Sequence, residues 1–470
     1  MKKITSLMAA LCIIIVSLFA PLSAQAKDKN NDEGMYNVSS EIYADAYMLI
    51  SLDDDTHPVI AQKNKDKKKY PASLTKIVTA IVALNNIPDL KAKTKVSKNA
   101  ITVLYGTGAQ VAGLEIGEEI TAEKLLELVL VYSACDACNV IAEMAAGGIT
   151  EFVKLMNNWV KSIGCTGTNF VNCDGLHDEN HYTTPADMAL ITLEAMKNET
   201  FNKISSLKSC EFHGYTYIHT NFMLDRFHVT YYYEYAEGIK TGSTSEAGYC
   251  VITKASKDGY NYLAIVMDSP VKKLKGYDTK CSFIDAASLF DWAFDSLKYS
   301  TVIKSNDIIS EIPVINGKDA DGVGLISKED VTALVPSSLD PSAVMITPIE
   351  PPAELEAPIT QGEKICEANV IYGDKIIATF DLVSAQSVEL STFLKIANAL
   401  KNFFGRKAVL AITLVLIALV ILYIYVFIKR LRRDKKRLAE KRRRREALDE
   451  QLSREYYERQ RNNLQPPKRK

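Results

Sequence analysis

Two short motifs in this sequence carry residue types that could act together on an acyl group. Ser73 and Lys76 stand three positions apart, and on a helix that spacing places a hydroxyl and an amine on one face. A serine becomes a nucleophile when an adjacent amine can take its proton. Lys240-Thr241-Gly242 offers a cation, a hydroxyl and a glycine that could hold a carboxylate and let a backbone come close. The two motifs together suggest nucleophilic catalysis by Ser73.

The Ser-x-x-Lys spacing is not specific by itself, because it also occurs at Ser205/Lys208 and Ser269/Lys272. Only the string at Ser73 follows Pro71-Ala72 at the start of an apolar helical pattern. There the serine could face a helix N-terminus and its positive dipole. The sequence therefore favours Ser73 over the other two serines.

Several predicted elements must position these motifs. Apolar residues on either side of an acidic turn predict a hairpin over 43–60, and a helix follows Pro71. We expect helices over 121–132, capped by Thr121, and over 149–163, 185–197 and 282–297. Strands are predicted over 249–253 and 262–267 with a turn at 257–259. The middle of the chain is thus a helix cluster between two strand regions.

Length and composition exclude several classes of protein. At 470 residues the chain has room for roughly three modules of about 150 residues. Hydrophobic residues make up 47% and charged residues 24%, which rules out disordered, collagen-like and small disulfide-scaffold proteins. The net charge of −1 hides a split: residues 429–470 carry +11 and the preceding 428 residues carry −12. Such a split indicates that the two parts sit in different surroundings.

The two termini explain this charge split. Residues 1–26 have the charged start, short apolar run and Ala-Gln-Ala end of a secretory signal peptide. Residues 408–428 form 21 uncharged positions, enough for one transmembrane helix of roughly 30 Å. Because residues 429–470 are strongly basic, we expect a single-pass cell-membrane protein with its catalytic domain outside and its tail in the cytoplasm. Residues 391–407 have the apolar spacing of an amphipathic juxtamembrane segment.

The region 299–390 is rich in β-branched residues separated by Gly, Pro, Asp and Ser, and it predicts a small β-rich domain. It contains no cluster of catalytic residue types. We therefore expect it to act as a stalk or docking module between the catalytic region, residues 40–297, and the membrane.

The order of the motifs resembles that of one enzyme family. Ser73-x-x-Lys76, Ser133 and Lys240-Thr241-Gly242 follow the three-motif pattern of penicillin-binding proteins and serine β-lactamases. Flanking strings narrow the resemblance to the D-alanyl-D-alanine carboxypeptidases, the low-molecular-mass penicillin-binding proteins; they lie at 71–76, 113–118, 170–176, 180–188 and 238–242. The resemblance implies an α+β fold: an antiparallel sheet with helices plus a helical lobe, then a β-rich domain and a C-terminal membrane anchor.

The resemblance also implies an acyl-enzyme mechanism that removes the terminal D-alanine of peptidoglycan stem peptides. Ser73 would be the nucleophile, Lys76 the general base and Ser133 a proton relay. Lys240 and Thr241 would bind the terminal carboxylate, with Gly242 completing the motif. Backbone N–H groups of Ser73 and Ser243 would form the oxyanion hole. β-Lactams would be expected ligands, and protein partners are not indicated.

One position departs from the family pattern. The second motif is usually Ser-x-Asn, but here it is Ser133-Ala134-Cys135. A literal Ser-x-Asn at 97–99 precedes the stretch that should lie before the motif, and we reject it. A thiol is a weaker hydrogen-bond donor than an amide, so Cys135 should loosen the positioning of substrate.

This departure leaves alternatives open. The protein could be a catalytically degenerate penicillin-binding protein that binds peptidoglycan or a partner. It could also be a β-lactamase, amidase or esterase on the same machinery, or an endopeptidase that cuts cross-links. We expect no metal, organic cofactor or nucleic acid. Cys135 and Cys138 form an isolated CxxC string without further ligands for zinc.

The remaining marked residues favour structural roles. Asn172, His181 and Asp187 are expected to hold loops and helix starts together. Cys250, on a strand, is expected to be a buried small hydrophobe.

Overall fold

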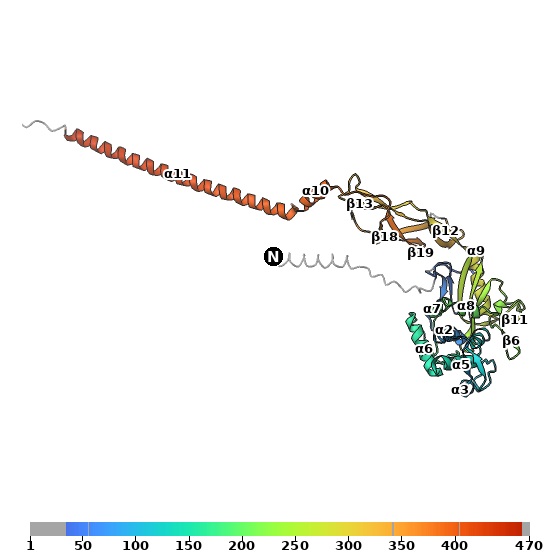
Figure 1. The fold of residues 1–470 in the computed structure, drawn as a ribbon. Helices are drawn as coiled ribbons and strands as arrows, with labels where there is room; N and C mark the ends of the chain where they lie inside the picture. Colours follow the sequence, from blue (N-terminus) through green and yellow to red (C-terminus); the bar gives the residue numbers. More distant parts are fainter. Residues whose placement is uncertain (1–33, 55, 341–342, 404, 463–470) are drawn as a thin grey trace, which may run out of the picture. The chain divides into compact units, whose positions relative to one another are not determined.

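The computed structural model describes residues 34–54, 56–340, 343–403 and 405–462 (Figure 1). The predicted signal peptide lies outside the described residues. The chain divides into two compact units. The first contains the described residues up to Ile303 together with Asp330–Thr347 and Asn369–Thr379, and the second contains Lys304–Glu329, Pro348–Ala368 and the chain from Phe380 onward.

A five-stranded antiparallel sheet forms the centre of the first unit. Its order is β2 (Val59–Lys63), β1 (Ala46–Ser51), β9 (Tyr260–Ser269), β8 (Gly248–Lys257) and β7 (Ala236–Thr244). β1 and β2 confirm the predicted hairpin. The strands predicted near 249–253 and 262–267 are the middles of β8 and β9. Asp258 and Gly259 lie at the predicted turn between β8 and β9, and both have positive φ.

Alternate residues of the sheet enter two different cores, as the two-residue repeat of a strand requires. In β1, Tyr47 and Leu49 pack with residues of α9 (Cys281–Ser296), whereas Met48 and Ile50 pack with residues of α2 (Thr75–Asn86). Both faces of the sheet are therefore covered by helices, and α2 is the helix that carries Lys76.

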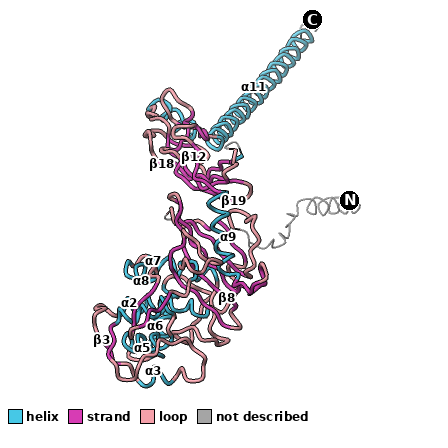
Figure 2. The backbone as a smooth tube through the Cα atoms, turned by 90° about the vertical axis from the view of Figure 1, so that its right-hand side faces the viewer, coloured by secondary structure: helices cyan, strands magenta, loops and turns pink. Residues whose placement is uncertain are grey.

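Within the first unit, the helices other than α9 gather in one lobe (Figures 1 and 2). They are α2, α3 (Lys98–Thr102), α4 (Ala122–Glu127), α5 (Cys135–Ala146), α6 (Ile149–Ser162), α7 (Pro185–Met196) and α8 (Glu199–Ser205). The helices predicted over 149–163, 185–197 and 282–297 are confirmed as α6, α7 and α9. Buried aliphatic residues of α2, α4 and α5 share one core with Phe152 and Met156 of α6.

The helix predicted over 121–132 differs in one respect. Thr121 caps α4 as expected, since its hydroxyl accepts from the Lys124 N–H at 3.3 Å. The helix then widens into a π-helical turn over Leu128–Tyr132 and ends at Ser133. Ser133 is left-handed, with φ 69° and ψ 33°, a conformation that is uncommon for residues other than glycine.

Short elements complete the first unit. The 3₁₀ turns are η1 (Ala72–Leu74) and η3 (Phe222–Leu224). Hairpins pair β3 (Lys93–Lys95) with β4 (Glu119–Thr121), β5 (Ser209–Phe212) with β6 (Tyr215–Ile218), and β10 (Val271–Leu274) with β11 (Tyr277–Lys280). β12 (Leu297–Ile303) pairs with β15 (Val331–Pro336).

The second unit is β-rich, as predicted for this part of the chain. β13 (Ile308–Ile315) pairs with β14 (Gly322–Ser327), which pairs with the end of β19 (Lys375–Ser384), and the short β17 (Leu355–Glu356) runs parallel to β13. β16 (Val344–Ile349) and β18 (Lys364–Tyr372) each have residues in both units. Its small core contains Val314, Val323, Ala357, Ile359 and Val388.

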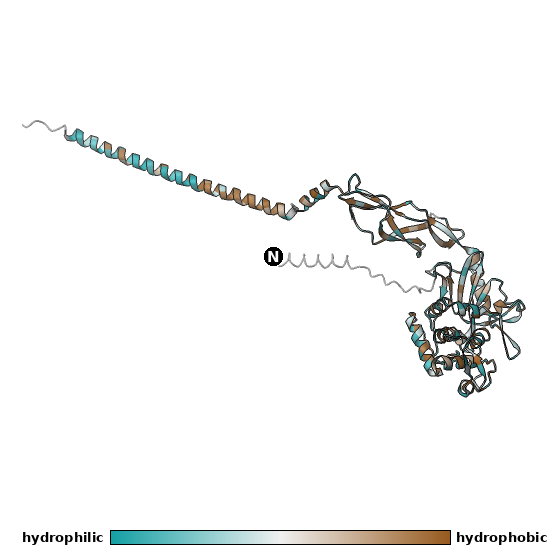
Figure 3. Ribbon diagram, in the orientation of Figure 1, coloured by the Kyte–Doolittle hydropathy of each residue, from teal (hydrophilic) through white to brown (hydrophobic). Residues whose placement is uncertain are grey.

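Two helices end the described chain. α10 (Thr392–Phe403) exposes Phe393, Ile396 and Leu400, which recur on one face. α11 (Arg406–Asn462) is apolar in its first part and polar beyond it (Figure 3). Its apolar part is long enough to cross a membrane, and none of it is buried. One C-terminal apolar helix therefore fits a membrane anchor.

Candidate active site

Ser73 and Lys76 lie where η1 runs into α2, and their side chains touch. The Lys76 amine donates to the Ser73 hydroxyl at 3.0 Å. Lys76 is fully buried, while Ser73 lines an open cleft. The three-residue spacing thus brings hydroxyl and amine together, with the hydroxyl facing outward and the amine behind it.

Two further groups accept hydrogen bonds from the Lys76 amine. It donates to the Cys135 thiol at 3.4 Å and to the Asp174 carbonyl. Burial lowers the pKa of Lys76, whereas negative charge on Cys135, Cys138 and Asp174 raises it above its usual value. Burial also raises the pKa of both thiols, so near neutral pH they carry no charge and their raising effect falls away. Burial is then the main effect left on the Lys76 amine, and burial favours loss of its proton.

Ser133 and Cys135 stand on the turn between the π-helical segment and α5. The Cys135 N–H donates to the Gln110 carbonyl at 2.7 Å. The buried carboxylate of Asp136 accepts from the N–H groups of Ala112, Gly113 and Leu114 at 2.9, 2.9 and 3.1 Å. These bonds tie the 107–114 loop to the start of α5. The loop then forms one wall of the cleft through Thr107, Gly108, Ala109 and Gln110.

The third motif lies on β7, beside the turn that carries Ser73. Lys240 is fully buried and donates to the Thr241 carbonyl at 2.9 Å. Burial lowers the pKa of Lys240 well below its usual value, and the nearby charge of Lys76 lowers it further. The Thr241 hydroxyl, in contrast, lines the cleft and donates to the Thr220 hydroxyl at 2.7 Å.

Gly242 allows β7 to approach this turn closely. A Cβ at Gly242 would lie 2.8 Å from the Pro71 carbonyl oxygen and 3.0 Å from the Ser73 nitrogen. On the opposite side of the turn, a Cβ at Gly175 would lie within 3.0 Å of Ala72 and Ser73 backbone atoms. The Ser73 turn is therefore held between two backbones that have no room for a side chain.

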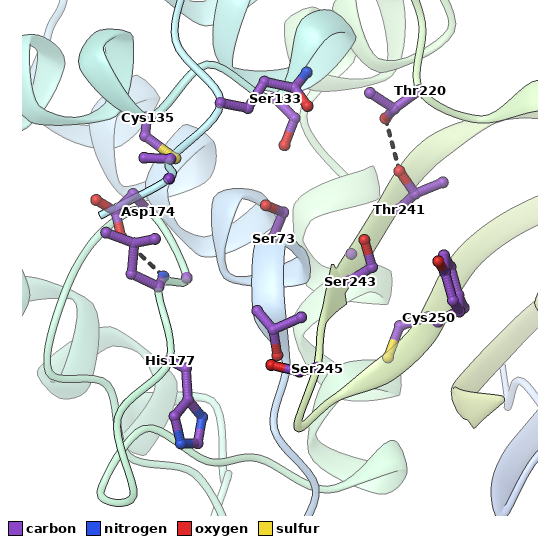
Figure 4. A pocket seen from close by; sticks show the side chains of 18 of the residues that line it. Ser73, Ser133, Cys135, Asp174, His177, Thr220, Thr241, Ser243, Ser245 and Cys250 are labelled. Carbon is purple, nitrogen blue, oxygen red and sulfur yellow. Dashed lines mark hydrogen bonds between the residues drawn. The ribbon is translucent and has the colours of Figure 1, made fainter. Parts of the chain in front are cut away.

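A cleft of about 530 Å³ brings most of the predicted residues together (Figure 4). Those that line it are Ser73, Ser133, Cys135, Thr241, Gly242 and Ser243. Lys76 and Lys240 lie behind this surface. Figure 4 shows Ser73 between Ser133 and Cys135 on one wall and Thr241 and Ser243 on the other.

Sequence reasoning missed several polar residues that line this cleft, among them Thr220 and Lys280. Thr220 contacts Thr241, and Lys280, at the end of β11, lies over the rings of Phe222 and Tyr249 at 4.8 and 5.4 Å. Burial lowers the pKa of Lys280. Neither residue belongs to a recognisable string. Thr220 lies in the loop before η3 and Lys280 ends β11, and only the tertiary structure brings them to the cleft.

The residues expected to have structural roles make contacts of that kind. Asn172 accepts from the Gly175 N–H and donates to the Leu176 carbonyl. Asp187 accepts from the Gly167 N–H at 2.8 Å and the Thr168 hydroxyl at 2.6 Å. The Cys250 thiol is buried and donates to the Ala247 carbonyl at 3.6 Å, although part of the residue also reaches the cleft.

His181 supports the Ser73 turn through Thr75. Its Nδ1 accepts from the Val171 N–H at 3.1 Å, so the ring proton is on Nε2, which faces the Thr75 hydroxyl at 2.8 Å. Thr75 in turn donates to the Ala72 carbonyl. Burial lowers the pKa of His181 to about 4, which keeps the ring neutral at neutral pH.

The rejected strings are explained by local contacts. Ser97 caps α3, its hydroxyl accepting from the Ala100 N–H at 3.0 Å. Ser205 is buried and donates to the Asn202 carbonyl. Ser269 is buried and donates to the Asp285 carboxylate at 2.6 Å. None of these three serines lines the cleft.

Comparison with known proteins agrees with this geometry. Residues 33–271 match the D-alanyl-D-alanine carboxypeptidase family model, and residues 298–390 match the model of the penicillin-binding protein 5 C-terminal domain. A D-alanyl-D-alanine carboxypeptidase of Bacillus subtilis, DacF, is 27% identical over 402 residues, covering 84% of this chain and 96% of that protein. DacA of Escherichia coli K12 is 28% identical over 422 residues, covering 86% and 96%.

A solved structure shows the same architecture. Penicillin-binding protein 5 of Haemophilus influenzae superposes with a TM-score of 0.58 at 26% identity, covering 75% of this chain and all of that chain. The family match spans half of the sequence and includes all three motifs. The chain therefore belongs to the D-alanyl-D-alanine carboxypeptidase family of serine-type hydrolases, the low-molecular-mass penicillin-binding proteins.

Proposed function

We propose that this protein is a membrane-anchored carboxypeptidase that removes the terminal D-alanine from peptidoglycan stem pentapeptides through an acyl-enzyme on Ser73. The observation that carries the proposal is the 3.0 Å contact between the Lys76 amine and the Ser73 hydroxyl, at the wall of an open cleft. A base at hydrogen-bond distance from a hydroxyl meets the first geometric requirement for nucleophilic catalysis.

In the acylation step, the Ser73 oxygen attacks the carbonyl carbon between the two D-alanines while neutral Lys76 takes the hydroxyl proton. The oxyanion is stabilised by backbone N–H groups of Ser73 and Ser243, a donor of this kind being worth about 3 kcal/mol. Ser133 passes a proton to the leaving amine, and the C–N bond breaks to release D-alanine. A water molecule then attacks the ester and restores Ser73.

The terminal carboxylate of the substrate is bound by Thr241 and Ser243 together with Lys280. Thr241 and Lys280 both line the cleft, whereas the Lys240 amine is turned toward the Thr241 carbonyl. Lys240 then acts without contacting the substrate. Its proximity to Lys76 favours the neutral form of one of the two amines, because two like charges repel each other. Lys240 therefore has a positioning and electrostatic role, and Thr241, Ser243 and Lys280 make the direct contact with the substrate carboxylate.

The charges on either side of the apolar segment support the proposed membrane topology. Residues 408–428 of α11 cross the membrane, the basic residues after Ile428 stay in the cytoplasm, and the catalytic region lies outside. This arrangement places the cleft on the side of the membrane where peptidoglycan is found.

A fluorescent penicillin tests the proposal on the full-length protein in detergent, beside Ser73→Ala. We expect Ser73-dependent labelling, and release of D-alanine from a D-Ala-D-Ala-terminated peptide. Labelling without release of D-alanine would favour a degenerate penicillin-binding protein. The replacement of the family's asparagine by Cys135 would then be the expected cause. Rapid loss of the label would favour a β-lactamase. Absence of labelling would contradict the proposal.

A further inference from the structure

Two thiols at the start of α5 have no part in the mechanism above. Cys135 is the first residue of α5 and Cys138 is the fourth, and both are free thiols. Cys135 lines the cleft with 4% of its surface exposed, while Cys138 is fully buried. An outer and an inner cysteine at the first turn of a helix is the arrangement that thiol–disulfide oxidoreductases use for a CxxC pair.

The helix spacing permits a bond between these two sulfurs. Residues three apart on a helix have Cα atoms about 5 Å apart, within the range of roughly 4.4–6.8 Å that a disulfide needs. The Cys138 thiol points back toward the beginning of α5, since it donates to the Ala134 carbonyl at 3.2 Å. It therefore lies on the same side of the first turn as Cys135.

The outer thiol is coupled to the proposed base. The Lys76 amine donates to the Cys135 sulfur at 3.4 Å, and the same amine donates to Ser73. The same amine lies at hydrogen-bond distance from the Cys135 thiol and can take its proton, which gives the thiolate, the form that reacts with disulfides. A change at this sulfur must alter one of the contacts that hold the base.

We propose that Cys135 and Cys138 form a reversible disulfide site that switches off acylation of Ser73. The oxidant is a small or protein disulfide that reaches the cleft. The Cys135 thiolate attacks one of its sulfurs, and the first thiol of the oxidant leaves. The Cys138 sulfur then attacks the Cys135 sulfur and displaces the second thiol. Two electrons and two protons pass to the oxidant, and one S–S bond forms within α5.

Closure of this bond draws the Cys135 sulfur toward Cys138 and away from Lys76. The amine then loses the neighbour that holds it on the side of α5, and its alignment with Ser73 is lost. Reduction by a dithiol reverses the step. The loss of acylation rests on the function proposed above, whereas formation of the disulfide does not.

The test uses full-length protein in detergent, incubated with oxidised glutathione or with dithiothreitol. Thiols are alkylated, and the digested peptides are examined by mass spectrometry. We expect a peptide with an internal Cys135–Cys138 link, 2 Da lighter than its reduced form. A link from Cys138 to Cys173, or no link under oxidised glutathione, would overturn the proposal.

Penicillin labelling provides the second readout. We expect oxidised wild-type protein to label at least tenfold more slowly than reduced protein, with full recovery in dithiothreitol. Cys138→Ala should label normally when reduced and should form no internal link. Cys173→Ala is the matched control, because its buried thiol donates to the Asn139 side chain at 3.3 Å and should leave the switch intact.

The two readouts separate the two proposals. Failure of reduced protein to label would contradict the proposed function, while the mass of the peptide still decides whether the disulfide forms. A linked peptide with an unchanged labelling rate would overturn the switch. Equal loss of labelling in Cys173→Ala and Cys138→Ala under oxidant would also overturn it.

Discussion

Gly242 offers a sharp test of how the site is assembled, because its missing side chain sets the distance between β7 and the Ser73 turn. A Cβ in Gly242→Ala would lie 2.8 Å from the Pro71 carbonyl oxygen and 3.0 and 3.1 Å from the Ser73 and Leu74 nitrogens. All three neighbours are backbone atoms, so no flexible side chain can move aside. To reach the 3.4 Å of an ordinary contact, the strand and the turn must part by about 0.6 Å.

That displacement separates the two backbone segments proposed to form the oxyanion hole. Misplacing a reacting group by about 1 Å costs on the order of 100-fold in rate, so we expect acylation to slow by at least about tenfold. Gly242 does not have a positive φ, so alanine adds no backbone strain there. Alanine should even be slightly better than glycine in a strand by conformational entropy. The loss of acylation rate in Gly242→Ala therefore measures only the lack of room for a side chain between β7 and the Ser73 turn.

The assay is the second-order rate of labelling by a fluorescent penicillin, measured with the thermal unfolding midpoint. Gly324→Ala is the matched control: it also lies in a strand, and the nearest neighbour of its Cβ would be 3.6 Å away. We expect the control to label at the wild-type rate. Labelling of Gly242→Ala within about a factor of two of wild type would refute the close-approach argument.

Three further predictions concern the surroundings of the site. Cys135→Asn replaces a weak acceptor of the Lys76 amine by an amide oxygen, a gain of about 0.5–1.5 kcal/mol, so acylation measured by penicillin labelling should rise about two- to tenfold, and a slower variant would contradict this. Asp136→Ala leaves three backbone N–H groups without their acceptor, at about 1–3 kcal/mol for each group left unpaired, and should lower the free energy of unfolding by at least about 3 kcal/mol in urea titrations. His181 has a pKa lowered from 6.5 to about 4 in the folded protein, so the unfolded chain binds its proton first as the pH falls. Stability from this residue is complete above pH 6.5 and is lost toward pH 4, about 3 kcal/mol in all, and His181→Gln should flatten the dependence of the unfolding midpoint on pH over that interval.

Much of the fold could be anticipated because local patterns and tertiary structure agree. The hairpin of β1 and β2, the Thr121 cap and the helices α6, α7 and α9 all follow apolar periodicity or capping chemistry that acts within a few residues. The end of the 121–132 helix could not be predicted from such local patterns. The π-helical turn and the left-handed Ser133 are imposed by packing against α5 and its neighbours, which no local pattern records.

The sequence by itself determined the residue types of the site and their order along the chain, since a hydroxyl three positions before an amine at a helix start meets it by helix geometry alone. Only the tertiary structure decided which groups share the cleft. It brought Thr220 and Lys280 to the wall from distant parts of the chain and turned Lys240 inward toward the Thr241 carbonyl. It also set the Cys135 sulfur against Lys76. Contacts between residues far apart in the chain depend on how the sheet and helices pack. The packing energy that fixes these contacts comes from the whole core and not from any one segment.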